Sequence, residues 1–274
     1  MAIPTDGVHA VSGSWDQTIR VWNLDTGREV RLIKGREVRR RRAIKGTLDY
    51  HGSHWGAVTS VATAVGGNLV VAGYDDGALK VWDLRIHRTP RTLTRASPKS
   101  SEATVEAVAL TQDGTFAIVN CRRDEGPTSR IEVWHIPSGK ETMRFDVHAT
   151  AVAPSPNGRL IVIGASRGPA SGLIVIWDRI EDKAIRTLEG HTNRVTALAV
   201  SADQRRLISA SEDHTVRLWD LQAGELLAVF TADSPILACA ATPDCEILVA
   251  GDALGAVHFL HFDEVLSISK SADI

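Results

Sequence analysis

The chain has 274 residues, of which 43% are hydrophobic and 23% are charged, and its formal net charge is −2. This is the composition of a soluble globular protein, and the near-neutral total excludes a global attraction to nucleic acid or membrane. The three cysteines, Cys121, Cys239 and Cys245, form no C-x-x-C pair and are odd in number, so neither a zinc site nor a disulfide framework is predicted. A reducing, cytoplasmic setting fits this cysteine usage.

The beginning of the chain carries no targeting pattern. The residues MAIPTDGVHAV lack the charged start and the long apolar run of a signal peptide. No uninterrupted apolar stretch reaches the length that a membrane-spanning helix needs. We therefore expect a cytoplasmic protein without membrane contact.

A short strand-like segment recurs six times along the chain. Five copies contain a Trp: TIRVWNL (18–24), ALKVWDL (78–84), RIEVWHI (130–136), LIVIWDR (173–179) and TVRLWDL (215–221). The sixth copy, AVHFLHF (256–262), has Leu260 in the Trp position. The step between these markers falls from 60 to 41 residues along the chain. A period near 41 indicates a repeat array.

The fifth copy shows what each repeat contains. Four segments rich in β-branched and apolar residues are separated by short turns, and they are RVTALAVS (194–201), LISAS (207–211), TVRLWDL (215–221) and ELLAVFT (225–231). Long helical periodicity is absent. Four short antiparallel strands form a blade, and blades arranged radially form a propeller. The sequence therefore predicts an all-β propeller.

We expect six four-stranded blades, whose third strands are centred on Trp22, Trp82, Trp134, Trp177, Trp219 and Leu260. The approximate blades are residues 1–35, 54–95, 103–147, 148–189, 190–232 and 233–270, with a basic inserted loop at 36–53. Met1 aligns inside an inner strand, so the first blade is truncated. Either the chain is the C-terminal part of a longer array or the ring closes imperfectly. Residues 264–269 are expected to form the outer strand of blade six.

The fifth copy resembles a WD40 repeat. The pairs GH (190–191) and WD (219–220) bracket it at the spacing of that family, and the likeness of the repeats covers essentially the whole chain. The resemblance implies a structural hydrogen-bonded tetrad of His191, Ser209, Asp213 and Trp219. Such a closed chain of partners is physically sound, because a buried indole N–H needs an acceptor and a buried carboxylate needs donors.

The other copies keep only part of this tetrad. The retained residues are Ser12, Asp16 and Trp22 in the first copy, and His54, Asp76 and Trp82 in the second. Ala72 replaces the Ser of the second copy. The third and fourth copies keep little more than the Trp, and the sixth has Leu254 in place of the Asp. We expect weaker hydrogen bonding in these blades.

No pattern of catalytic, metal-binding or cofactor-binding residues stands out. A His–Ser–Asp set also occurs in hydrolases, but here its spacing is the one that the repeat itself requires. The pairs His51/His54 and His258/His261 have no carboxylate or Cys companions at metal-ligand spacing. Phosphate-binding and dinucleotide-binding glycine motifs are absent. The sequence therefore predicts a protein that is not an enzyme and that needs no metal or cofactor.

The copies differ in length on one face of the predicted propeller, here called the top face. The insertions are residues 34–53, 94–103, 121–130 and 164–172. The basic residues of this candidate binding face are Arg39, Arg40, Arg41, Arg42, Arg122, Arg123, Arg130 and Arg167. Insertions on one face of a repeat protein often form its binding surface. The alternatives are an acidic protein partner, a nucleic acid or phosphorylated ligand, and a merely solvated loop.

We expect a scaffold or sensor module that binds a protein or peptide through the top face. Recognition of nucleic acid or of a phosphorylated ligand is the alternative. The segment 230–264 resembles the closing repeat of bacterial multidomain signalling proteins, in which a WD40 array follows a STAND-type nucleotide-binding module. That resemblance implies a sensor role beside a switch domain.

Overall fold

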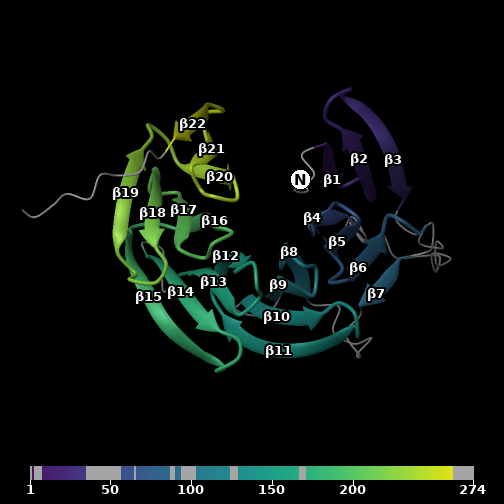
Figure 1. Cartoon of the computed structure of the whole chain (residues 1–274), viewed down its shortest axis with the longest axis horizontal. Helices are drawn as coiled ribbons and strands as arrows, with labels where there is room; N and C mark the ends of the chain where they lie inside the picture. Colours follow the sequence, from purple (N-terminus) through teal and green to yellow (C-terminus); the bar gives the residue numbers. More distant parts are fainter. Residues whose placement is uncertain are drawn as a thin grey trace, which may run out of the picture. The chain divides into compact units, whose positions relative to one another are not determined.

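The computed structural model describes residues 2, 8–34, 57–64, 66–86, 90–93, 103–123, 129–166 and 171–261. These residues form β-strands joined by turns, and no helix occurs within them (Figure 1). The chain divides into two compact units, residues 1–158 and 159–274.

The first unit contains twelve strands. They are β1 (His9–Gly13), β2 (Thr18–Asn23), β3 (Arg28–Lys34), β4 (Val58–Thr63), β5 (Leu69–Tyr74), β6 (Leu79–Asp83), β7 (Arg91–Leu93), β8 (Ala103–Leu110), β9 (Phe116–Arg123), β10 (Ser129–His135), β11 (Lys140–Val147) and β12 (Ala149–Pro154).

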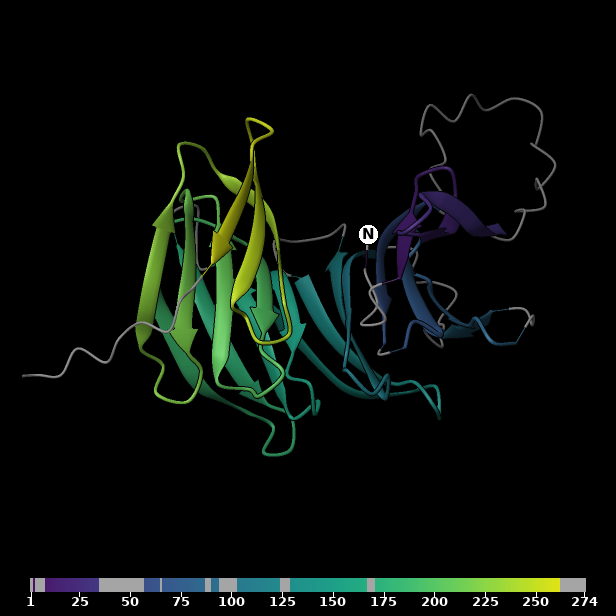
Figure 2. The same ribbon diagram turned by 45° about the horizontal axis from the view of Figure 1, so that its top comes forward.

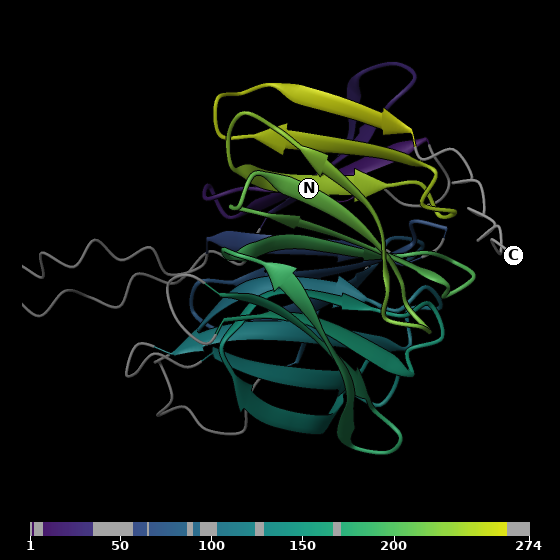
Figure 3. The same ribbon diagram turned by 90° about the vertical axis from the view of Figure 1, so that its left-hand side faces the viewer.

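The second unit contains ten strands. They are β13 (Leu160–Ala165), β14 (Gly172–Asp178), β15 (Lys183–His191), β16 (Val195–Val200), β17 (Arg206–Ser211), β18 (Thr215–Asp220), β19 (Leu226–Thr231), β20 (Ile236–Ala241), β21 (Ile247–Asp252) and β22 (Val257–His261). Figures 2 and 3 show the last three side by side as one sheet, coloured yellow.

The strands form six mainly antiparallel sheets, each a run of consecutive strands. The orders are β1-β2-β3, β4-β5-β6-β7, β8-β9-β10-β11, β12-β13-β14-β15, β16-β17-β18-β19 and β20-β21-β22. The protein is therefore an all-β, six-bladed propeller, as the sequence predicts. Of the described residues, the first and last sheets use three strands each. The proposed outer strand at 264–269 lies outside the described residues, as does the whole of the 36–53 loop with its arginine run.

The marker residues occupy one equivalent place in every sheet. The strand that carries the marker is β2 in the three-stranded first sheet and the third strand in every other sheet. It pairs at its marker with the preceding strand, and these pairs are Ala10–Trp22, Val70–Trp82, Ala117–Trp134, Ile161–Trp177, Leu207–Trp219 and Leu248–Leu260. In four blades the fourth strand bulges just before the Trp. A bulge strengthens the local twist of a strand. The repeat in the sequence therefore corresponds to a repeat in the pairing register of the strands.

Apolar side chains fill the spaces between successive sheets. One buried cluster joins the first two blades, with Val11 and Val70 fully buried, and another joins blades two and three through Val71 and Val105. A third cluster joins blades five and six. Both faces of an inner strand are covered in this arrangement, which explains why strands such as β5 are apolar at nearly every position.

Two of the expected loops are shorter than their sequences indicated. Part of the insertion expected at 121–130 is strand, because β9 ends at Arg123 and β10 begins at Ser129. Cys121 is buried and pairs with Arg130 across the two strands. In the same way Gly164 and Gly172 belong to β13 and β14 rather than to the loop between them. Hydrogen bonding between strands outweighs the loop-like composition at both places.

A glycine in the second strand sets how closely two blades approach. Gly13 and Gly73 lie three residues after the partner of the Trp marker, and Gly251 takes the same place in blade six. A Cβ on Gly13 would lie 2.3 Å from Cγ1 of Val58, and one on Gly73 would lie 2.1 Å from Cγ1 of Val105. A Cβ on Gly251 would meet no atom within 4 Å. Gly13 and Gly73 therefore each leave space for a valine side chain of the next blade.

This difference gives a direct test of blade packing. We expect Gly73→Ala to lower the free energy of unfolding by about 1–3 kcal/mol, because the added methyl overpacks the contact with Val105. The matched variant Gly251→Ala should change it by less than about 0.5 kcal/mol, since nothing occupies that space. Urea unfolding of both variants measures the two values. Equal losses would show that the close approach at Gly73 does not limit packing.

Candidate functional site

The four residues of the expected tetrad come from three strands and one turn of blades four and five. His191 is the last residue of β15, and Ser209 and Trp219 lie on β17 and β18. Asp213 sits in the turn between β17 and β18. The antiparallel register of these strands brings residues together that are up to 28 positions apart in the sequence.

A continuous chain of hydrogen bonds joins the four side chains. Trp219 Nε1 donates to Ser209 Oγ at 2.8 Å, Ser209 Oγ lies 2.7 Å from His191 Nε2, and His191 Nδ1 lies 2.8 Å from Asp213 Oδ2. A carboxylate only accepts, so the network assigns the imidazole proton to Nδ1. Ser209 then donates its hydroxyl proton to Nε2. Each buried polar group thereby has a partner.

Asp213 receives further donors that hold it in the ionised form. Thr215 Oγ1 donates to Oδ1 at 2.6 Å, and the amide of Thr192 donates to Oδ2 at 3.0 Å. Burial alone raises the pKa of this carboxyl, but the hydrogen bonds from His191, Thr215 and Thr192 lower it by more. The net result is a pKa well below the usual value. Asp213 is therefore a fixed negative charge in the turn.

This geometry matches the order of groups in a hydrolase triad, yet the serine is inaccessible. Ser209 is 0% exposed and its oxygen already accepts from Trp219. A nucleophile must reach the substrate carbonyl, and a buried, hydrogen-bonded hydroxyl does not. The four residues thus tie β15, β17 and β18 together, which is a structural role.

The partial tetrads keep individual contacts. In the first blade Trp22 Nε1 donates to Ser12 Oγ at 2.8 Å, and Asp16 Oδ1 accepts from the Thr18 hydroxyl at 2.6 Å. In the second blade Asp76 Oδ1 accepts from the amide of Ala78 at 3.0 Å, and Trp82 is buried. His54 lies outside the described residues.

Other blades use different polar groups at the same strands, and these were missed from the sequence. In the third blade Trp134 Nε1 donates to Oε2 of the buried Glu132 at 3.2 Å. In the sixth blade His258 Nε2 lies 3.0 Å from Asp252 Oδ2, and the hydrogen bond from His258 is the main cause that lowers the pKa of Asp252. Glu132 lies two residues before Trp134 on β10, and Asp252 and His258 lie on the neighbouring strands β21 and β22, but the marker alignment did not include these positions.

The described part of the basic top face is largely neutralised by acidic neighbours. Arg122 Nη1 lies 3.3 Å from Glu106 Oε1, and Arg130 Nε lies 3.3 Å from Asp146 Oδ1. Arg123 is the last residue of β9. The remaining members of this expected face, Arg39, Arg40, Arg41, Arg42 and Arg167, lie outside the described residues. Two of the arginines predicted to bind a partner, Arg122 and Arg130, thus form ion pairs within the chain itself.

Within the ranges that the structure covers, no group of three His, Cys, Asp or Glu side chains could hold a metal ion. The same ranges include no helix long and apolar enough to cross a membrane.

The sheets and the buried tetrad define the chain as a β-propeller built from repeats. Family models agree with this description in two parts of the chain. The model for the WD domain, G-beta repeat, matches residues 1–23 and 44–83, and the model for the TEP-1 C-terminal β-propeller matches residues 191–262. The fold is that of a β-propeller, and these parts of the chain are similar to WD40-type repeats.

Curated relatives of the chain are also WD40 proteins. The chain is 25% identical over 233 residues to guanine nucleotide-binding protein subunit beta-1 of Nicotiana tabacum, covering 79% of the chain and 54% of that protein. It is 27% identical over 216 residues to protein groucho of Drosophila melanogaster, covering 76% of the chain and 28% of that protein. The chain thus spans about half the length, or less, of these relatives. The resemblance of residues 230–264 to STAND-type proteins stays a prediction.

The tetrad contributes to the free energy of unfolding by an amount that can be measured. We expect Trp219→Ala to lower the free energy of unfolding by about 3–5 kcal/mol, because it removes a buried aromatic ring and leaves Ser209 without its donor. The control is Trp15→Ala, since Trp15 is 76% exposed and its loss should cost less than about 0.5 kcal/mol. Chemical denaturation of both variants measures the difference. A small loss for Trp219→Ala would contradict the packing described for blade five.

The low pKa of Asp213 predicts a pH dependence of stability. The folded-state pKa lies below the unfolded value of about 4, so the ionised carboxylate stabilises the fold above that pH, and this contribution is lost as the pH falls through the folded pKa. The stability difference between the wild type and Asp213→Asn should therefore shrink as the pH is lowered from about 6 to about 3. Urea unfolding at several pH values measures it. A difference independent of pH would show that Asp213 carries no such contribution.

Proposed function

We propose that the chain is a non-enzymatic scaffold that binds a protein or peptide partner. The observation that carries the proposal is the match to WD40 proteins, one of which is named as a subunit of a guanine nucleotide-binding protein. The sheets of a propeller present their loops and edges to partners. The burial of Ser209 supports the non-enzymatic part, because the one triad-like set is closed to substrates.

We also propose a cellular context for the chain. The likeness of residues 230–264 to the closing repeat of STAND-type proteins supports a sensor role within a larger bacterial signalling protein. Cys121, Cys239 and Cys245 form no disulfide within the described residues, which supports a reducing cytoplasm.

A nucleic acid or a phosphorylated ligand is the second candidate, favoured by the run of four arginines at Arg39–Arg42. The pairing of Arg122 and Arg130 with acidic side chains weighs against it, because paired guanidinium groups offer less charge to a phosphate. We therefore prefer the protein partner.

The two candidates differ in salt dependence. The test is capture of partners from native cell extract by the full chain, beside a variant in which Arg39, Arg40, Arg41 and Arg42 are changed to Ser, followed by titration with duplex and single-stranded nucleic acid at several salt concentrations. A captured protein that binds saturably, with moderate salt dependence, is the expected result.

Two results would contradict the proposal. Failure to retain any protein from the extract would remove its support. Sub-micromolar nucleic-acid binding that is lost in the Ser variant, with a log–log salt slope of about 0.9 per neutralised phosphate on duplex DNA, would favour the second candidate.

A further inference from the structure

An arginine of the fourth strand crosses to the next blade at three equivalent places. Arg31, Arg91 and Arg186 each pair in register with the residue that precedes the Trp marker of their own blade. Arg91 Nη1 donates to the carbonyls of Ile136 and Pro137 at 3.0 and 2.9 Å. Arg186 donates from its two Nη atoms to Ala223 and Gln222 at 2.7 and 2.8 Å. We call each of these contacts an arginine clamp.

A glycine makes room for the guanidinium in two of the clamps. A Cβ on Gly139 would lie 1.9 Å from Nη2 of Arg91, and one on Gly224 would lie 2.6 Å from Cδ of Arg186. Both glycines have positive φ, 67° and 77°, and close the turn that supplies the carbonyls. The arginine and the glycine turn therefore form one fitted unit.

The first clamp is incomplete. Arg31 Nη1 donates to the carbonyl of Leu84 at 2.9 Å, and this is its single hydrogen bond within the described part of the chain. The corresponding connection of blade two, residues 84–90, contains no glycine. Nη2 and Nε of Arg31 thus keep their donor capacity, and the described residues place no carboxylate beside the guanidinium.

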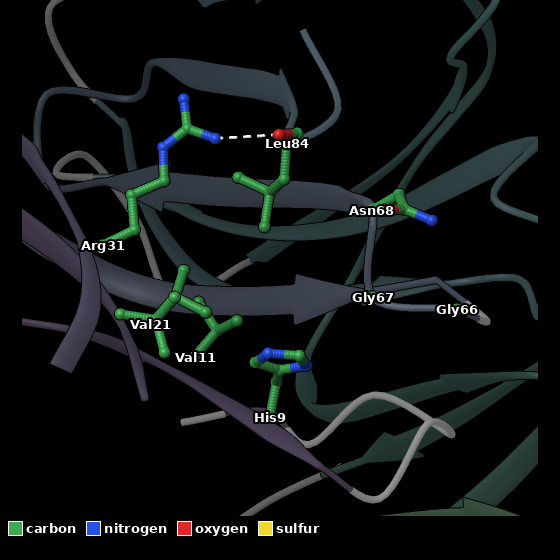
Figure 4. A pocket seen from close by; sticks show the side chains of 9 residues that line it. His9, Val11, Val21, Arg31, Gly66, Gly67, Asn68 and Leu84 are labelled. Atoms are coloured by element: carbon green, nitrogen blue, oxygen red, sulfur yellow. Dashed lines mark hydrogen bonds between the residues drawn. The ribbon is translucent and has the colours of Figure 1, made fainter. Parts of the chain in front are cut away.

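A cavity of about 500 Å³ adjoins this incomplete clamp. Val11, Val21 and Leu84 supply apolar lining, and Arg31, Asn68 and His9 supply polar groups (Figure 4). Ligand pockets usually measure about 300–1,000 Å³ and combine an apolar lining with a few polar groups. The cavity lies between blades one and two, near the turn Gly66–Asn68.

We propose that this cavity binds a partner peptide in which an aliphatic side chain adjoins an Asp or a Glu. The inference rests on the proposed scaffold function and names the chemistry of its partner. The carboxylate accepts from Nη2 and Nε of Arg31, which match its two oxygens in the forked geometry of guanidinium–carboxylate pairs. The aliphatic side chain packs on Val21 and Leu84.

Features of the rim favour a peptide over a free small acid. Gly66 and Gly67, both with positive φ, line the cavity without side chains, so an extended backbone approaches closely there. The side-chain amide of Asn68 makes no hydrogen bond within the described residues and offers both donors and an acceptor to a peptide backbone. Val30, at the edge of the cavity, is 58% exposed and extends the apolar surface outward.

The test is selection of random peptides on the purified full chain, followed by binding titrations with labelled peptides that carry the enriched motif. We expect enrichment of acidic residues next to Leu, Ile or Val. The Arg31→Ala variant should bind the selected peptide at least about tenfold more weakly, because it loses charge-assisted hydrogen bonds. Replacing the peptide's acidic residue by its amide should cost a similar factor. Val30→Glu should also weaken binding by charge repulsion at an exposed position.

Blade four provides matched controls. Arg186→Ala removes a complete clamp, and Ile185→Glu adds a charge at the exposed bulge position equivalent to Val30. Neither change should alter peptide affinity by more than about twofold. Equal effects of the two Arg variants would overturn the proposed site, as would a selection without acidic aliphatic motifs. Binding of free isocaproate, but of no peptide, would overturn the peptide assignment.

The failure of this inference is distinguishable from failure of the scaffold function. A partner captured from extract equally well by the wild type and by Val30→Glu would leave the scaffold in place and remove this cavity as its site.

Discussion

The structure depends on the need to bury both faces of each sheet. A single four-stranded sheet of apolar strands leaves two wide surfaces in water, and only a neighbouring sheet on each side covers them. Between the first three sheets this burial is achieved by close fit: Gly73 leaves the space that Val105 fills, and Gly13 does the same for Val58. Hydrogen-bonded side chains and arginine clamps refine this packing, but they act on sheets that the apolar contact has already brought together.

The fold could be predicted from the sequence because each repeat is marked by patterns of neighbouring residues. The Trp markers, the turn residues and the alternation of β-prone residues all act within a few positions, so strand limits such as those of β17 and β18 were close to the observed ones. The tetrad of blade five could be proposed as well, through its family resemblance. Its four residues then needed only the correct register to meet.

The arginine clamps could not be predicted in the same way. Arg31 reaches a carbonyl 53 positions away and Arg186 reaches one 36 positions away. Every residue has a backbone carbonyl, so the sequence does not show which carbonyl accepts the hydrogen bond from the arginine. The buried pair of Trp134 and Glu132 was missed for a related reason. A charged residue on a strand is normally predicted to be exposed, and the hydrogen bond that allows Glu132 to be buried is not visible in the sequence. The incomplete clamp at Arg31 becomes visible only by comparison with the complete clamps at Arg91 and Arg186.

The consecutive order of strands within each sheet has a consequence for how the chain reaches its fold. Each strand pairs with the one that follows it through a short connection, so the entropy of closing each ladder is small. All-β proteins often fold slowly because their strand pairs are distant in sequence. Here a blade completes its own ladders before the next one is needed, and folding can begin in any blade and spread to its neighbours. During synthesis, the earlier blades therefore offer a finished apolar face on which each later blade condenses.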